Sequence, residues 1–229
     1  MDLRTRIRPT GGKRHLKVVD ADLDPRKRPT LRFALVGYLV EKMSETPYKD
    51  YIRKNIWEPL EMSSTNFSPT PQMEERIAVP YVVDAKTGHH EPALRLKADV
   101  WPAGIVYGTV LDQANWLIAN LNGGAFKGKR LLSKETLELM HTRQFARFAG
   151  PMEYGYGNET TGYGLTWIVT QRGGERYFAH SGSVPGYTTF LLGNLDRKLG
   201  FAILTNGNRA HRHIAGLAER ALDLLADRP

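Results

Sequence analysis

The sequence predicts an α+β protein in which helices flank an antiparallel sheet. The chain has 229 residues, of which 41% are hydrophobic, so it can bury the core of one large domain or two small ones. Residues 163–208 are rich in Ile, Leu, Val, Phe, Tyr and Thr and read as three antiparallel strands. Turns are expected at Gly173-Gly174 and at residues 196–198. Segments on either side of this block show helical periodicity.

Two helices are expected near the start of this domain. From Phe33 to Glu45, apolar residues recur at 33, 35, 36, 39, 40 and 43, which is typical of a helix with one buried stripe. Gly37 lies within it and predicts a close-packing point. A second helix should begin around Pro47 and run to about Trp57, because proline is favoured in the first turn.

Three further helices follow from capping and periodicity. Thr109 is the expected N-cap of a helix that ends before Asn122, Gly123 and Gly124, and Ser133 is the expected N-cap of the next. The segment 209–226 is amphipathic and should pack on the sheet, with an apolar side formed by Ile214, Leu217, Ala218, Ala221, Leu222 and Leu225.

A strand beginning at Tyr81 enters a turn that contains Lys86-Thr87-Gly88. Asp, Gly and polar residues at this spacing are ordinary hairpin chemistry, so we interpret the tripeptide as structural. His89 and His90 follow, and no third ligand stands at metal-binding spacing. We therefore predict no metal site and no cofactor.

The strongest candidate site is His180-Ser181-Gly182-Ser183, followed by a Pro-Gly pair and Tyr187. Glycine and proline next to a strand let its backbone approach a ligand closely, and His180 adds a group that titrates near neutral pH. The alternative is a plain corner between a strand and a turn. The surroundings decide between the two.

Those surroundings resemble the penicillin-binding and class C β-lactamase-like serine hydrolases, a family that includes esterases and D-aminopeptidases. The resemblance rests on GYGLTWIV, on HSGSVPGYTTFLLGNLDRKLGFAILTNGN and the helix after it, and on two upstream blocks, PYKDYIRKNIWEPLEMSSTNF and PAGIVYGTVLDQANWLIANLNGG. It covers about residues 33–227. It implies a β-lactamase/DD-peptidase-like fold that lacks its N-terminal portion.

The resemblance also implies roles for the candidate residues. The Ser183 amide would donate to the oxyanion, and His180 would stand where relatives carry Lys or His. Ser181 would support the hydroxyl network, Gly182 would let the substrate approach, and Tyr187 would wall the pocket. In relatives, the helix matching residues 33–45 directly follows a Tyr-x-Asn loop, but here the corresponding places hold Arg28, Pro29 and Thr30.

The nucleophile that the family uses has no counterpart in the sequence. The resemblance implies an acylating serine that is followed by a lysine one helical turn later, at i+3, where the two side chains face each other. Each of the seven serines fails this test, since position i+3 holds Pro47, Asn66, Phe67, Pro71, Thr136, Val184 or Gly186. A triad of Ser181 or Ser183 with His180 is disfavoured, because neighbours on a strand point to opposite faces.

Charge, cysteine content and the N-terminus limit the remaining functions. The net charge is +8, and residues 1–32 hold ten Lys/Arg against four Asp, or +6. This segment does not match the family, and we interpret it as a solvated tail or an artefactual start, since it lacks the aromatics that stack on bases. No run of about 18 apolar residues and no apolar signal segment are found, so we expect no membrane span and a cytoplasmic chain, or a periplasmic or secreted one if the true N-terminus is missing. No cysteine is present.

The sequence therefore predicts a truncated serine hydrolase, acting on a small ester, amide, peptide or β-lactam substrate, that is inactive alone. A non-catalytic remnant that binds a peptide or acyl group is the alternative, and a nucleic-acid-associated protein is a distant third. Because relatives add strands beside the closing helix, we also expect an open sheet edge that promotes self-association.

Overall fold

The computed structural model describes residues 29–84, 86–96, 101–145 and 160–226. Its centre is a five-stranded antiparallel sheet in the order β5-β6-β7-β8-β9. The strands are β5 (Gly162–Tyr163), β6 (Ile168–Arg172), β7 (Glu175–Val184), β8 (Tyr187–Asn194) and β9 (Leu199–Thr205). This confirms the predicted α+β class.

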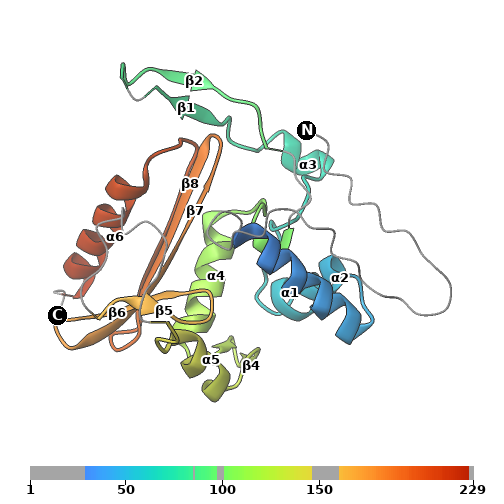
Figure 1. Cartoon of the computed structure of the whole chain (residues 1–229), viewed down its shortest axis with the longest axis vertical. Helices are drawn as coiled ribbons and strands as arrows, with labels where there is room; N and C mark the ends of the chain where they lie inside the picture. The colour runs from blue at the N-terminus through green and yellow to red at the C-terminus, as the bar shows by residue number, and fades with distance from the viewer. Residues whose placement is uncertain (1–28, 85, 97–100, 146–159, 227–229) are drawn as a thin grey trace.

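The sequence prediction of three strands in this block was wrong. The expected turns at Gly173-Gly174 and residues 196–198 exist, but a further turn at Pro185-Gly186 divides the expected central strand into β7 and β8. Gly186 has a φ of 82°, a conformation that glycine adopts without a steric penalty. The tip of the long β7–β8 hairpin therefore stands directly beyond the predicted site residues (Figure 1).

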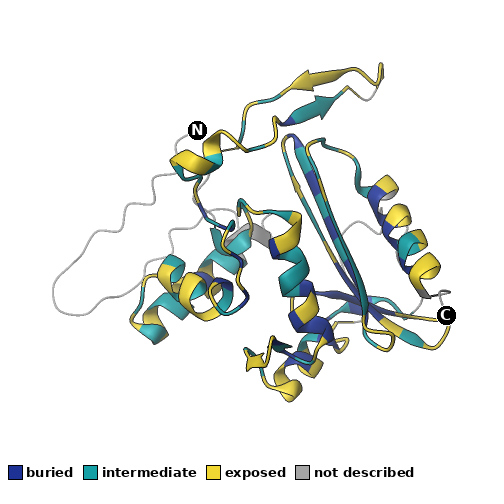
Figure 2. Ribbon diagram, turned by 180° about the vertical axis from the view of Figure 1, so that it is seen from behind, coloured by how far each residue is buried: buried dark blue, intermediate teal, exposed yellow. Residues whose placement is uncertain are grey.

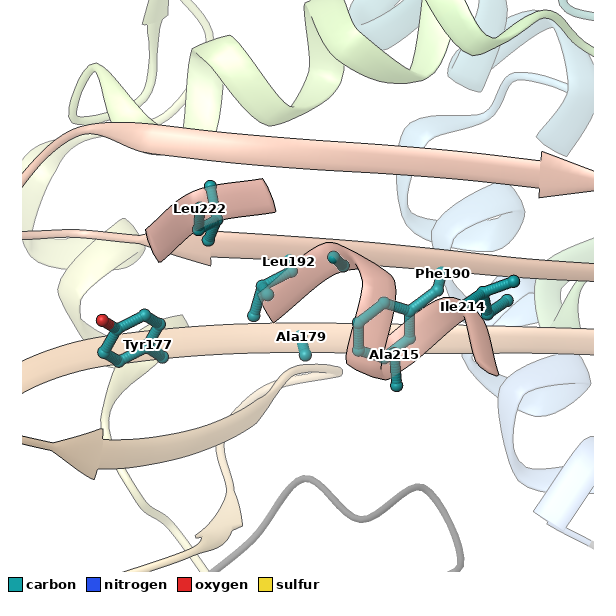
Figure 3. Close-up of a cluster of buried hydrophobic side chains, with 8 residues drawn as sticks. Tyr177, Ala179, Phe190, Leu192, Ile214, Ala215 and Leu222 are labelled. Atoms are coloured by element: carbon teal, nitrogen blue, oxygen red, sulfur yellow. The ribbon is translucent and has the colours of Figure 1, made fainter. Parts of the chain in front are cut away.

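Helices cover both faces of this sheet. On one face lies α6 (His211–Ala226), and on the other lies α4 (Val110–Leu121), as Figure 1 shows. The α6 side chains Ile214, Ala215, Ala218 and Leu222 join Tyr177, Ala179, Phe190 and Leu192 of the sheet in one buried cluster (Figure 3). Leu217 is 57% exposed and Leu225 is 41% exposed, so only part of the predicted apolar side of this helix packs on the sheet.

The opposite face carries a second cluster. Leu117 and Leu121 of α4 pack with Trp167, Val169 and Phe178 of the sheet region. Both clusters need the strict alternation of β7, in which Phe178 points to α4 while its neighbours Tyr177 and Ala179 point to α6. This alternation fixes the face on which each residue farther along β7 lies.

A separate cluster surrounds Trp57, Leu60 and Phe67 and takes side chains from α2 (Tyr48–Ile52), the π-helix η1 (Arg53–Trp57) and the 3-10 helix η2 (Trp101–Ala103). Helix α1 (Pro29–Ser44) contacts α2 and η2. The other helices are α3 (Pro71–Glu74) and α5 (Lys134–His141), and α5 packs against the cluster on the α4 face of the sheet. The predicted close-packing point is confirmed, since a Cβ on Gly37 would lie 2.2 Å from Pro102 Cγ.

Both predicted caps are confirmed. Thr109 accepts a hydrogen bond from the Asp112 amide, and Ser133 accepts one from the Thr136 amide. Two short hairpins complete the fold, β1 (Tyr81–Val83) with β2 (His90–Pro92), and β3 (Ala125–Phe126) with β4 (Lys129–Arg130). The residues of β2 are exposed, whereas β6, β7 and β8 and the sheet-facing sides of α4 and α6 carry buried residues (Figure 2).

Candidate functional site

The half of β7 that contains the predicted site residues is paired on one side only. Strand β6 pairs with β7 from Glu175 to Ala179 and stops there, whereas β8 pairs with β7 from Tyr177 to Val184. Among the residues that the structure describes, no strand pairs with the outer edge of residues 180–184. Backbone N–H and C=O groups on this edge are therefore available to an extended ligand.

The two-residue turn determines which amides face that edge. Val184 and Tyr187 close the hairpin around Pro185-Gly186. In such a hairpin the closing pair exchanges backbone hydrogen bonds, and the direction of the backbone groups then alternates along the strand. Ser183 and Ser181 consequently direct their N–H and C=O groups to the open edge.

Side chains alternate between the two faces. His180 lies on the α4 face with Phe178, and its ring meets the edge of Trp167 with centroids 6.3 Å apart. Ser181 and Ser183 lie on the α6 face, opposite Phe190 and Thr188 of β8. A hydroxyl and an imidazole on opposite faces of one strand cannot exchange a proton directly, which agrees with the expectation that these residues form no triad.

His180 keeps an exposed surface, yet neighbouring protein atoms crowd its ring. This desolvation lowers the pKa of His180 from its ordinary value of 6.5, and a hydrogen bond to the Ser181 backbone opposes the effect. The Nε2 atom of the ring lies 3.4 Å from the hydroxyl of Tyr163. The imidazole is thus held from two sides beside the open edge.

Gly182 and Gly186 are required by close contacts. A Cβ on Gly182 would lie 2.5 Å from the Thr189 hydroxyl on β8, and a Cβ on Gly186 would lie 2.2 Å from Pro80 Cβ. The second contact brings the hairpin tip against the segment before β1. The glycines thus serve packing within the protein as well as any approach of a ligand.

Tyr187 anchors the hairpin tip. Its hydroxyl donates a 2.7 Å hydrogen bond to the Ala78 carbonyl, which comes 109 residues earlier in the chain. Desolvation raises the pKa of Tyr187, while the nearby Arg95 guanidinium acts in the opposite direction. The residue predicted to wall a pocket therefore also has a structural partner.

A cavity of about 450 Å³ lies elsewhere, between the β1–β2 hairpin and the start of α6. It is lined by Tyr81, Val83, His90, residues 205–210 and His213, and none of the five predicted site residues lines it. The chemistry-bearing residues sit instead on an open strand edge. We therefore take the β7 edge as the candidate site.

The tripeptide Lys86-Thr87-Gly88 occupies the β1–β2 turn, as predicted. The carboxylate of Asp84 accepts hydrogen bonds from the amides of Lys86 and Thr87, at 2.8 Å each. His89 and His90 are exposed, and across the described residues no three His, Cys, Asp or Glu side chains are grouped as metal ligands. Within the same residues, no helix is long and apolar enough to cross a membrane.

Sequence reasoning missed two residues of the site, Tyr163 and Trp167. Both lie in the GYGLTWIV block, which was interpreted as a strand and as part of the family resemblance, with no site residue in it. No pattern in that block signals that its aromatic side chains reach His180 from a neighbouring strand. Residues 1–28 of the N-terminal segment lie outside the described residues, so the interpretation of this segment as a solvated tail or an artefactual start stays a prediction.

Comparisons with known proteins agree with this geometry. A beta-lactamase family model matches residues 30–226. A human beta-lactamase-like protein is 29% identical over 183 residues, which cover 79% of this chain and 33% of the relative. The octameric penicillin-binding protein homologue from Pyrococcus abyssi superposes with a TM-score of 0.69 at 29% identity, covering 87% of this chain and 42% of the other.

A more distant structure shares the fold. The D-amino acid amidase from Ochrobactrum anthropi, in complex with L-phenylalanine amide, gives a TM-score of 0.66 at 20% identity over 86% of this chain and 57% of that one. The chain thus spans between a third and somewhat more than half of the length of these three proteins.

Proposed function

The chain belongs to the beta-lactamase family, and on that premise we propose that it carries the substrate-binding strand of a serine hydrolase. The substrates are esters, amides or β-lactams, and the reaction passes through an acyl-enzyme. The observation that carries the proposal is the open outer edge of β7 with the Ser183 amide directed to it.

This edge suits an acyl ligand. An extended ligand alongside residues 180–184 would pair with the backbone as an added strand, and the Ser183 N–H would donate to its carbonyl oxygen. A donor fixed by a paired strand needs little reorganisation when negative charge develops on that oxygen. His180 would stand on the α4 face next to the reacting group, and Tyr187 would bound the site at the hairpin tip.

The acylating serine would come from polypeptide outside this sequence or from a second chain. None of the seven serines is followed by lysine at i+3, and Ser181 and Ser183 lie across the strand from His180. We therefore expect the chain alone to bind without turnover. The alternative function, recognition of a peptide or acyl group with no catalysis at all, is favoured by the same two facts.

Turnover is tested with a short-chain p-nitrophenyl ester and a covalent serine probe, on the wild-type chain and on His180→Ala. We expect neither hydrolysis nor labelling by the chain alone. Hydrolysis and labelling that both disappear in His180→Ala would show that a serine of this chain is activated after all, and would overturn the assignment of the nucleophile to another polypeptide.

Binding is tested by titrating the 15N-labelled chain with phenylalanine amide and following the amides of residues 181–183. Ser183→Pro removes the proposed donor at an edge position where proline is tolerated, and Ser183→Ala removes the hydroxyl but keeps the N–H. We expect binding to be lost in Ser183→Pro and kept in Ser183→Ala. Equal binding by both variants would rule out the Ser183 amide as the donor.

Self-association through β9 is also proposed. Within the described part of the chain no strand pairs with its outer edge, and its sequence LGFAILT has no charge and no proline. Arg172 of β6 forms a 3.3 Å ion pair with Glu219, so this flank of α6 faces β6. The opposite flank of the helix, which carries the exposed Leu217 and Leu224, therefore faces the β9 side. Light scattering after size exclusion should show oligomers that Ala202→Lys reduces.

A further inference from the structure

Tyr163 makes a second, unexpected contact at the candidate site. Its hydroxyl donates to the Thr166 carbonyl at 3.2 Å and lies 3.4 Å from Nε2 of His180. The hydroxyl carries a single proton. Because that proton points to the Thr166 carbonyl, the oxygen can only accept from the imidazole.

The turn between β5 and β6 creates this arrangement. Tyr163 pairs with Ile168, and the Gly164 amide donates to the Trp167 carbonyl at 2.8 Å. Between them, Thr166 has a φ of 68°, which is unfavourable for a β-branched residue. Backbone strain of this kind concentrates at functional sites, and here it places a carbonyl where the Tyr163 hydroxyl can reach it.

The second nitrogen of the ring has a different neighbour. The Ser181 backbone favours the charged form of the ring through a hydrogen bond that raises the pKa of His180, and since Nε2 faces Tyr163, the nitrogen on that side is Nδ1. Ser181 belongs to the set of residues whose backbone groups face the open edge. Nδ1 is therefore the nitrogen next to the place where a ligand would lie.

We propose that Tyr163 is a positioning residue that keeps a proton on Nε2 of His180, so that Nδ1 is the nitrogen that gains and loses a proton at the open edge. In the neutral ring, Nε2–H donates to Tyr163 and the Nδ1 lone pair is free to accept from a ligand or a water. In the charged ring, Nδ1–H donates to the Ser181 carbonyl. The hydrogen bond of one nitrogen thus sets the role of the other.

No charged neighbour competes with this arrangement among the described residues. The groups against the ring are Tyr163 from β5, Trp167 from the turn before β6, and Leu191, the cross-strand partner on β8. Of these only Tyr163 titrates, and desolvation raises its pKa, so the hydroxyl stays protonated at neutral pH. The tautomer then depends on hydrogen bonding alone.

Only the idea that Nδ1 meets a ligand rests on the proposed function. The tautomer of His180 can be tested without ligand or turnover. The experiment is a long-range 1H–15N spectrum of the His180 ring in the full chain at a pH where the ring is neutral, with His180→Gln used to assign its signals. In the wild type we expect the Nε2–H tautomer. In Tyr163→Phe, which keeps the aromatic ring but loses the acceptor, we expect the proton to move to Nδ1, where the Ser181 carbonyl accepts it.

Tyr187→Phe is the matched control, because it removes the hydroxyl of another tyrosine of the site that does not touch His180. It should leave the His180 tautomer unchanged. An Nδ1–H tautomer in the wild type, or the same tautomer in wild type and Tyr163→Phe, would overturn the proposal even if ligand binding at the β7 edge is confirmed. The wild-type spectrum alone shows which ring nitrogen of His180 carries the proton.

Discussion

The two halves of β7 differ in almost every physical respect although they belong to one strand. From Glu175 to Ala179 the strand is paired with β6, from Tyr177 onward it is also paired with β8, and it places Tyr177, Phe178 and Ala179 in the two cores. From His180 to Val184 it is paired only with β8 within the described residues, and no side chain of this half is buried.

The difference shows how a strand separates stability from function. The first half fixes the position of the whole strand through buried contacts on both faces. The second half inherits that position and needs few contacts of its own, so its backbone groups can stay free for a ligand. Substitutions in the first half should therefore change stability, and substitutions in the second half should change binding.

The largest effect is expected for Phe178→Ala. Phe178 is fully buried between Trp167 and His141, and removal of a buried aromatic side chain costs about 3–5 kcal/mol. The free energy of unfolding is measured by urea denaturation. Ser183→Ala in the second half should cost less than about 0.5 kcal/mol, and equal losses in the two variants would contradict the comparison.

Acid should lower the stability of the protein through His141, which packs against the first half of β7. His141 stacks on Phe178 with ring centroids 4.3 Å apart, and burial together with the charge of Arg176 lowers the pKa of His141 from 6.5 to about 4. Between these values the unfolded chain binds a proton that the folded chain does not. The free energy of unfolding should therefore fall by about 3 kcal/mol as the pH falls from about 6.5 to about 4.

The matched variant for this step is His141→Leu, which replaces the imidazole with an apolar side chain of similar size. Urea denaturation across the same pH range should show a much flatter dependence in this variant. If the wild type and His141→Leu lose stability in parallel, the loss belongs to other groups.

A smaller effect is expected where the second half meets β8. Gly182→Ala would bring a Cβ to 2.5 Å from the Thr189 hydroxyl, so we expect a loss of about 1–2 kcal/mol. Thr189→Ala removes that hydroxyl. In its background, Gly182→Ala should cost much less, and a double-mutant cycle that finds the two changes additive would show that this contact is not the cause.

The smallest effect should be a gain. Thr166→Gly relieves the strain of a threonine at a φ of 68° but gives the unfolded chain more conformational freedom. The strain released exceeds this entropic cost, so we expect a net stabilisation of about 1 kcal/mol. Leu165→Gly is the control, since Leu165 is not among the residues with positive φ and should lose stability. Loss of stability in both variants would show that the Thr166 conformation stores no strain.

Local signals in the sequence predicted much of this architecture. The helix caps at Thr109 and Ser133 and the close contact at Gly37 depend on side chains a few residues away or on the absence of one, and such signals can be read from a sequence. The Pro185-Gly186 turn was missed because strand-forming residues surround it, although proline followed by glycine suits a tight turn.

The site was harder to predict for a physical reason. The resemblance to a known family identified residues 180–183, but Tyr163 reaches His180 only because Thr166 adopts a conformation that its side chain disfavours. His141, at the end of α5, reads as an ordinary basic residue near a helix terminus. Its burial against Phe178 depends on how α5 meets the sheet, and no local pattern shows it.

The anchoring of the hairpin tip has a consequence for the order in which the site is made. Tyr187 bonds to Ala78, and the loop after β9 holds β1 through Asn208, whose side chain accepts from the Val83 amide at 2.8 Å. Contacts between residues so far apart in sequence form slowly. During synthesis, a nascent chain that has reached Ser183 already holds every candidate residue on β7, yet the site takes shape only after the ribosome has also delivered β8, β9 and the turn into α6.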